Sequence, residues 1–208
     1  MAKLTRDFFD RDTVTVARDL VGTYLVRVWQ GERLVCRLTE TEAYVGPIDK
    51  GCHAYQYRRT ARTEPLFAAP GHTYVYLIYG MYHCLNLVTE PEGEPCAVLL
   101  RGGSPRLGGE TISRLRYGKP LRELTAYQRK NFLNGPGKLC KGLALTREHN
   151  LIDVTASEEL YVVSSLADLG LEEEPDSGPI HTGKRIGIDY AEEAADFPWR
   201  FWTEDRPI

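Results

Sequence analysis

The sequence predicts an α+β fold: a single domain with a curved, mainly antiparallel β-sheet, flanking helices and a projecting β-hairpin. Three observations favour it. Strand-like runs rich in valine, leucine, tyrosine and threonine follow one another along most of the chain, with turn-forming residues between them. Few segments have helical periodicity. The 208 residues contain no internal repeat and no linker long enough to separate two domains, so residues 1–208 are expected to fold as one domain.

The first half of the chain is expected to contain one helix and most of the strands. Residues 12–22 have helical spacing, with Asp12 as a candidate N-cap. The next long segment, residues 45–72, contains several glycines and prolines and is expected to be irregular. The predicted strands are residues 23–29, 33–44, the two arms of a hairpin at 72–79 and 81–90, and 96–102.

The second half is expected to alternate helices with late strands. A helix is predicted around residues 110–118, and a second at 138–145 after the loop Asn-Gly-Pro-Gly. Residues 160–166 and 184–190 have the composition of strands, and residues 196–208 resemble a final, aromatic strand.

Charge is distributed unevenly along the chain. The net charge is −3, yet residues 101–141 carry ten Lys or Arg against two Glu, whereas residues 151–183 carry eight Asp or Glu and no Lys or Arg. This pattern fits either two solvated faces or a basic face for a polyanion with an acidic segment elsewhere. No apolar run approaches the ~18–20 residues of a membrane span, and the first residues lack the hydrophobic region of a signal peptide. With five cysteines and no CxxC pair, we expect a cytoplasmic protein with reduced thiols and no membrane partner.

Several common kinds of catalytic site are not indicated. The five histidines lack HExxH spacing, and no Cys/His set has zinc-finger spacing, so neither a metal nor another cofactor is expected. The segment Gly135-Pro-Gly-Lys138 lacks the earlier glycine and the Ser/Thr of a phosphate-binding loop, and no GxSxG nucleophile motif occurs.

Two glutamates stand out within a predicted strand. In TETEAY, Glu40 and Glu42 are two residues apart, so strand alternation places both on the face shared by the apolar Cys36 and Leu38. An inward glutamate has a raised pKa and is costly unless it is paired. Arg101, at the end of the apolar run AVLLR, is a candidate partner. The pattern fits a positioned glutamate that activates water, or two acids at a solvated strand end.

Aromatic residues lie close to these acids in the predicted sheet. Tyr74 and Tyr76 share one face of their strand, and Tyr44 follows Glu42 by two residues. Such rings beside a carboxylate suit a flat, electron-poor or cationic ligand, although tyrosines are also ordinary residues of a half-buried sheet. Tyr79 precedes Gly80 at the predicted turn, where packing does not require an aromatic ring.

The order of the motifs resembles the alkyladenine (3-methyladenine) DNA glycosylase family, the type found in mammals and many bacteria. The resemblance covers most of the chain. It is carried by ETEAYVGPIDKGCH (40–53), PGHTYVYLIYGMYHCLN (70–86), AVLLRG (97–102), NGPGKLCKGLAL (134–145) and RIGI (185–188). It implies an enzyme of base excision repair that flips damaged purines out of double-stranded DNA and hydrolyses their glycosidic bond.

The resemblance also implies roles for residues of the hairpin and the pocket. Tyr79, with Met81 and Tyr82 beside it, would fill the gap left in the duplex by the flipped nucleotide. Three rings would stack on the flipped base, and an amide would reject the amino group of guanine. The rings are those of Tyr44, His53 and Tyr76, and the amide is that of Asn86.

For catalysis, the resemblance implies that Glu42 deprotonates the attacking water. Arg101 and the backbone near Ile188 would hold that water or the glutamate. Because no lysine in the matching motifs is placed to form a Schiff base, a monofunctional enzyme without lyase activity is expected. Its substrates would include 3-methyladenine, 7-methylguanine, hypoxanthine and ethenoadenine, which the sequence does not rank.

Contacts to the DNA backbone are expected from basic residues on two loops. Arg58, Arg59 and Arg62 lie in one, and Lys138 lies where NGPGK opens a helix whose amides favour a phosphate. The loop of residues 54–65 departs from the small, glycine-containing loop of mammalian members, which leaves its DNA contacts open. A monomer is sufficient for this activity.

Two other interpretations are possible. A non-catalytic nucleic-acid-binding module would use the tyrosine hairpin for stacking and would not need Glu42. A sugar glycosidase using Glu40 and Glu42 is disfavoured, because residues two apart on a strand lie only ~6.6–6.8 Å apart on one face and cannot straddle a substrate.

Overall fold

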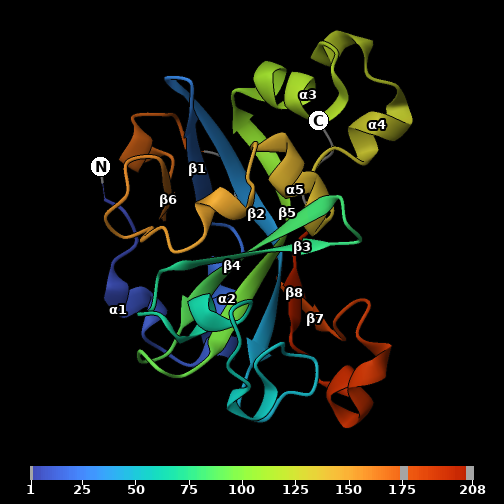
Figure 1. The fold of residues 1–208 in the computed structure, drawn as a ribbon. Coiled ribbons are helices and arrows are strands. Elements are labelled where there is room, and N and C mark those ends of the chain that lie inside the picture. The colour runs from blue at the N-terminus through green and yellow to red at the C-terminus, as the bar shows by residue number, and fades with distance from the viewer. Residues whose placement is uncertain (1, 174–177, 205–208) are drawn as a thin grey trace.

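The fold is a curled antiparallel sheet with helices on its flanks, as predicted (Figure 1). The computed structural model describes residues 2–173 and 178–204. Within these residues the main path of the sheet runs in the order β3-β4-β5-β2-β1-β6, and β8 joins β2 and β7 beside that path. Every pairing is antiparallel. The strands are β1 (Tyr24–Trp29), β2 (Glu32–Val45), β3 (Thr73–Ile78), β4 (Tyr82–Thr89), β5 (Cys96–Leu107), β6 (Leu160–Val163), β7 (His181–Gly183) and β8 (Arg200–Trp202).

The predicted helices are present, and two short ones were not anticipated. The side chain of Asp12 accepts a hydrogen bond from the Thr15 amide at 2.8 Å, which confirms it as the N-cap of α2. The short helices α1 and α4 have too few turns for a periodic pattern to be visible in the sequence. The helices are α1 (Arg6–Phe9), α2 (Thr13–Leu20), α3 (Gly109–Tyr117), α4 (Ala126–Lys130) and α5 (Pro136–Gly142). Six short 3-10 segments join them in the described residues, among them Tyr55–Tyr57 and Asp189–Asp196.

The main core lies between the sheet and α2, α3 and α5. From α2 it takes Val16, Ala17 and Leu20, which are fully buried against β2 and β5 residues such as Leu38 and Leu100. Because this face of the sheet is filled by apolar side chains, the polar side chains of the same strands can be concentrated on the other face.

A double irregularity in the β2–β5 pairing changes which way the two glutamates point. The register pairs Leu38 with Gly103, Glu40 with Gly102 and Thr41 with Leu100, so Thr39 on β2 and Arg101 on β5 are each skipped. Before the bulge, the even-numbered Leu34, Cys36 and Leu38 face the main core, whereas after it Ala43 does. The prediction that Glu40 and Glu42 share the face of Cys36 and Leu38 is therefore wrong. The extra residue sends them to the opposite face.

The β3–β4 hairpin extends away from the sheet and carries its tip beside α5 (Figure 1). Tyr79 and Gly80 both have positive φ, 54° and 69°, and the Met81 amide donates to the Ile78 carbonyl at 3.2 Å. This is the geometry of a two-residue type I′ turn, for which Asn-Gly is the favoured pair. Tyr79 is therefore an unfavourable residue for the backbone at this position.

Four strand predictions need correction. The strand expected at 184–190 is absent: residues 184–188 are irregular, with Gly187 at a φ of 76°, and a 3-10 segment starts at Asp189. The strand expected at 160–166 ends at Val163. Arg101 does not end its strand, because β5 continues to Leu107. Of the predicted final strand, only Arg200–Trp202 is extended and paired, and residues 205–208 lie outside the described residues.

Within the described residues, no helix combines the length and the hydrophobicity needed to cross a membrane.

Candidate active site

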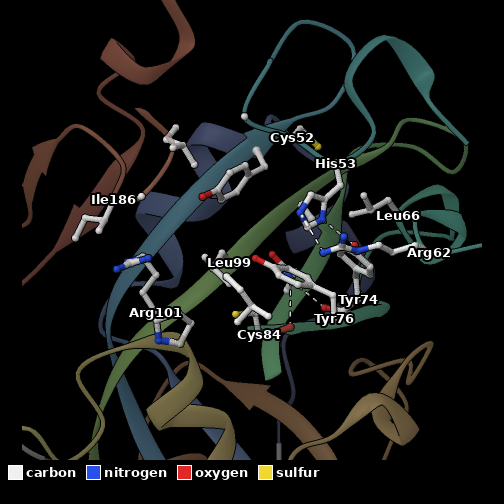
Figure 2. Close-up of a pocket in the computed structure, with 18 of the residues that line it drawn as sticks. Cys52, His53, Arg62, Leu66, Tyr74, Tyr76, Cys84, Leu99, Arg101 and Ile186 are labelled. Atoms are coloured by element: carbon white, nitrogen blue, oxygen red, sulfur yellow. Dashed lines mark hydrogen bonds between the residues drawn. The ribbon is translucent and has the colours of Figure 1, made fainter. Parts of the chain in front are cut away.

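A cavity of about 300 Å³ opens on the polar side of β2, β4 and β5 (Figure 2). Its walls come from distant parts of the chain. Figure 2 shows His53, Tyr74 and Tyr76 on one side and Arg101 and Ile186 on the other. The predicted pocket residues Tyr44, Asn86 and Ile188 also line it, as does Tyr79. The fold thus brings together residues spread over nearly 150 positions of sequence.

Glu42 lies behind the cavity wall and is fully buried. Its Oε2 accepts a hydrogen bond from the Tyr44 hydroxyl at 2.8 Å, and its Oε1 accepts one from the Ile186 amide at 2.7 Å. Arg101 reaches both oxygens, with Nε 3.3 Å from Oε1 and an Nη1 hydrogen bond of 3.5 Å to Oε2. Each oxygen of the Glu42 carboxylate thus accepts at least one hydrogen bond and lies within ion-pair distance of Arg101. The backbone group that contacts Glu42 belongs to Ile186, two residues before the predicted Ile188.

Burial raises the pKa of Glu42 above that of an ordinary glutamate, because the ionised form loses its hydration. Arg101, the Ile186 amide and the Tyr44 hydroxyl oppose this shift, whereas the neighbouring charge of Glu40 adds to it. Burial, followed by the charge of Glu42, also raises the pKa of Tyr44, which therefore keeps its proton and donates it. A carboxylate with a raised pKa that lies directly behind a cavity wall can serve as a general base once a water molecule reaches it.

Arg101 is shared between the two glutamates. Its Nε donates to Glu40 Oε1 at 3.1 Å, and the same Glu40 oxygen accepts from Arg200 Nε at 2.6 Å. Arg200 comes from β8, which pairs with the second half of β2, and its guanidinium lies 4.3 Å from the Trp202 ring centroid. Two carboxylates and two guanidiniums thus form a connected group that reaches from the cavity wall to β8.

Rings pack at right angles on the opposite wall. The His53 and Tyr76 centroids lie 4.6 Å apart at 77°, and the Tyr74 hydroxyl lies 2.9 Å from His53 Nδ1. Burial, helped by the charge of Arg62, lowers the pKa of His53 to about 4, so the imidazole is neutral at pH 7. The hydrogen bond between Tyr74 and His53 orients the imidazole, a role that strand composition could not indicate.

Tyr44 is held from behind by a buried ion pair that sequence reasoning missed. The Arg185 guanidinium lies 4.7 Å from the Tyr44 ring centroid and pairs with Asp49, and both charged side chains are fully buried. Arg185 also donates to the Ala43 carbonyl at 2.8 Å and to the Ala194 carbonyl at 2.9 Å. It therefore fastens the loop after β2 and the segment after β7 to the strand that carries Glu42. In the sequence, Arg185 is a single arginine within a predicted strand, and this pattern does not indicate an ion pair with Asp49.

Asn86 is buried at the floor of the cavity with its amide held in place. Its Nδ2 donates to the Tyr74 carbonyl at 3.0 Å and to the Cys84 carbonyl at 3.4 Å. Because both acceptors are backbone groups of the hairpin strands, the amide plane is held by the sheet. An amide held in this way can discriminate between the edges of flat ligands.

The hairpin tip presents its apolar side chains to solvent. Tyr79 is 82% exposed, Met81 67% and Tyr82 40%. Tyr82 is partly covered because its side chain lies against Gly137 of α5, where an added Cβ would approach the Tyr82 Cβ to 2.9 Å and its ring to 3.0 Å. Among the three residues predicted to enter DNA, Tyr79 is therefore the freest, and Tyr82 braces the tip on α5.

The four basic residues predicted to contact DNA differ in their surroundings. Arg58 is exposed, and among the described residues it has no ion-pair partner. Arg59 is bound through two nitrogens to Glu64, at 2.6 and 2.8 Å. Arg62 lies at the cavity mouth, 5.4 Å from the Tyr76 ring centroid. Lys138 donates to the side chains of Asn131 and Asn134 at 3.1 and 2.8 Å. Arg58 and Arg62 are thus the most available for a new anion.

No group of three or more His, Cys, Asp or Glu side chains is placed to hold a metal ion in residues 2–173 and 178–204. All five cysteines are free and buried.

Comparison with known proteins gives consistent matches along the whole chain. The sequence model of the family described as "Methylpurine-DNA glycosylase (MPG)" matches residues 7–207. Relatives carrying the name "Putative 3-methyladenine DNA glycosylase" occur in several bacteria. One from Clostridium perfringens strain SM101 is 51% identical over 203 residues, covering 98% of this chain and 96% of its own. One from Alkaliphilus oremlandii is 47% identical over 206 residues (99% and 98%), and one from Desulfitobacterium hafniense is 44% identical over 205 residues (99% and 97%).

Proposed function

Because the chain belongs to the methylpurine-DNA glycosylase family and is a DNA glycosylase, we propose that it is a monofunctional enzyme of base excision repair. Its substrates are alkylated or deaminated purines in double-stranded DNA: the class of 3-methyladenine, 7-methylguanine, hypoxanthine and ethenoadenine. The enzyme hydrolyses the N-glycosidic bond and leaves an abasic site. The observation that carries this proposal is a buried carboxylate of raised pKa joined by hydrogen bonds to the wall of an aromatic cavity.

The damaged nucleotide enters the cavity after rotating out of the duplex. Its base stacks between Tyr44 on one wall and His53 with Tyr76 on the other. Neutral His53 suits this role, because an imidazolium there would repel a cationic alkylated base. The Tyr74 hydroxyl and the Arg185 guanidinium hold the two walls in place. Binding of the base therefore requires little further ordering of these side chains.

Glu42 activates the attacking water. Because Glu42 is buried behind these donors, a water molecule reaches it by replacing one of them, and the 3.5 Å hydrogen bond from Arg101 Nη1 is the longest. Glu42 then takes a proton from the water, whose oxygen bonds to the anomeric carbon as the bond to the base nitrogen breaks. The carboxylate also stabilises positive charge on the sugar. Arg101 and the Ile186 amide keep Glu42 oriented.

Base selection and DNA contact use groups outside the reacting atoms. Asn86, fixed by two backbone carbonyls, rejects the exocyclic amino group of normal guanine. Tyr79 fills the space vacated in the duplex, with Met81 and Tyr82 next to it. Arg58, Arg62 and Lys138 meet the phosphates, and Arg59 does so less because Glu64 already neutralises it. The enzyme acts as a monomer and residues 1–208 as one domain.

Duplexes that each carry one of the four lesions test the proposal. After incubation with the protein, alkali cleaves the strand wherever a base has been released. We expect release of at least one lesion by the wild type, and a fall of roughly 100- to 10,000-fold for Glu42→Gln. Glu158→Gln, an acid that is 79% exposed and paired with Lys3, should behave like the wild type. Damaged DNA that is bound but never hydrolysed would favour the non-catalytic binding module instead.

A further inference from the structure

Arg200 belongs to the connected group of Glu40, Glu42, Arg101 and Arg200, yet its own hydrogen bond goes to Glu40 and not to Glu42. In the β2–β8 register it stands directly opposite Glu42, and Trp202 stands opposite Glu40. Side chains at directly opposed positions lie on the same face of a sheet, so Arg200 starts beside Glu42. Its guanidinium nevertheless crosses diagonally to Glu40 Oε1, at 2.6 Å, and stacks on Trp202.

This diagonal contact affects how strongly Arg101 interacts with each of its two carboxylate partners, Glu40 and Glu42. Glu40 Oε1 accepts from both guanidiniums, at 3.1 Å from Arg101 and 2.6 Å from Arg200. The shorter bond to Arg200 satisfies Glu40 in part, and the longer contact leaves Arg101 free to reach Glu42 at 3.3 Å. The side chains of Glu40 and Arg101 are 15% and 11% exposed, so water replaces little of this interaction.

We propose that Arg200 is a positioning residue which, by neutralising Glu40, keeps Arg101 directed at Glu42 and holds Glu42 ionised for its reaction with water. The inference rests on the proposed role of Glu42 as the base. It assigns a purpose to β8, a short strand that contributes no side chain to the cavity wall in the described residues.

The charges around Glu42 decide the sign of the effect. From β2 it faces Glu40 and the Tyr44 hydroxyl, from β5 Arg101, and from the segment after β7 the Ile186 amide. The Tyr76 hydroxyl of β3 and the Cys84 thiol of β4 also interact with its charge. The Arg185 guanidinium lies beyond Tyr44 and is bound to Asp49. Glu40 raises the pKa of Glu42 and Arg101 lowers it. Loss of Arg200 leaves Glu40 to be compensated by Arg101, which is drawn away from Glu42, so the pKa of Glu42 rises. Loss of the Glu40 charge lowers the pKa of Glu42.

The two single variants should therefore shift the pH dependence in opposite directions. Activity needs ionised Glu42 and is lost as the pH falls through its pKa. For Arg200→Gln we expect the acid limb of single-turnover base release to move to higher pH by roughly half a unit or more, and for Glu40→Gln to lower pH by a similar amount. In Glu40→Gln/Arg200→Gln the limb should lie where it does in Glu40→Gln alone, because Arg200 acts through Glu40.

The controls separate this effect from misfolding and from a general change in charge. Arg11 resembles Arg200 closely, since it pairs with Asp19 at 3.0 Å and stacks 4.5 Å from Phe8, yet it lies in the N-terminal segment. Arg11→Gln and Asp19→Asn should leave the acid limb in place. Arg200→Lys keeps the charge and should move the limb less than Arg200→Gln.

Glu42 itself can be titrated by ¹³C NMR of side-chain carboxyls in the folded proteins, so the inference does not depend on activity alone. Shifts of the Glu42 titration in the same direction for both single variants, or no shift in either, overturn the role of Arg200. A wild type that releases no base overturns the proposed function, whatever the titration shows. A wild type that releases base with an unmoved limb in both variants overturns the inference alone.

Discussion

Replacing Tyr79 with asparagine should make the protein more stable and less able to act on DNA. Tyr79 is 82% exposed, so its ring contributes little to folding by burial. Its φ of 54° is the left-handed conformation, which costs an ordinary L-residue about 1–2 kcal/mol and costs asparagine less. We therefore expect Tyr79→Asn to raise the free energy of unfolding by about 0.5–1 kcal/mol. For a chain of this length, that corresponds to about 1–4 °C in Tm.

The weaker action of Tyr79→Asn on DNA follows from the loss of the aromatic ring. An aromatic side chain that stacks on a base is worth about 1–3 kcal/mol, so the flipped state should become roughly 5- to 150-fold less populated. Ethenoadenine reports this population, because its fluorescence rises when it leaves the base stack. The measurement is made in a Glu42→Gln background, where the base should not be released.

Tyr79→Phe is the matched control, since it keeps both the ring and the backbone strain. It should have the Tm and the flipped population of the parent. Undiminished flipping in Tyr79→Asn would refute the wedge role, and a Tm lower than that of the parent would refute the account of the turn.

Three further outcomes are expected. Because burial raises the pKa of Glu42, single-turnover activity should be lost on acidification at a pH above the ~4.3 of an ordinary glutamate. This acid limb of the pH profile should be absent from the residual activity of Glu42→Gln. An acid limb at or below pH ~4.3 in the wild type would contradict the prediction. Asn86→Ala should raise the ratio of guanine release to hypoxanthine release by about 10- to 100-fold, measured on undamaged and hypoxanthine duplexes, and an unchanged ratio would remove Asn86 from base selection. Arg185→Met leaves Asp49 buried without its partner and should lower the free energy of unfolding by about 3–5 kcal/mol, measured by denaturant unfolding. Much of this loss should be recovered in Arg185→Met/Asp49→Asn. Equal stability of the single and double variants would count against the ion pair.

The fold class and the hairpin could be predicted because local chemistry specifies them. Alternating β-branched and aromatic residues predict most of the strands, and Tyr79-Gly80 lies between two such runs. The order of the motifs predicted the residues of the pocket through the family resemblance, and Tyr44, His53, Tyr76 and Asn86 all line the cavity.

Other parts of the site depend on contacts that no local pattern carries. Arg185 and Asp49 are 136 residues apart, and the Ile186 amide reaches Glu42 only because the segment 184–188 is not a strand. Strand alternation also misplaced the glutamates, since a bulge is a property of the pair of strands rather than of either sequence. In the sequence, Arg200 is simply a basic residue in an aromatic C-terminal segment. Only the pairing of β8 with β2 shows that it stands opposite Glu42.

The skipped Thr39 makes the site depend on the backbone in a way that side-chain chemistry does not reveal. If Thr39 rejoined the ladder at unchanged chain length, regular alternation would turn Glu42 toward the apolar core and Ala43 toward the cavity. A change at Thr39 that favours regular pairing should therefore abolish the site, although Thr39 does not line the cavity. The irregular pairing of β2 is thus as necessary to the site as the identity of its side chains.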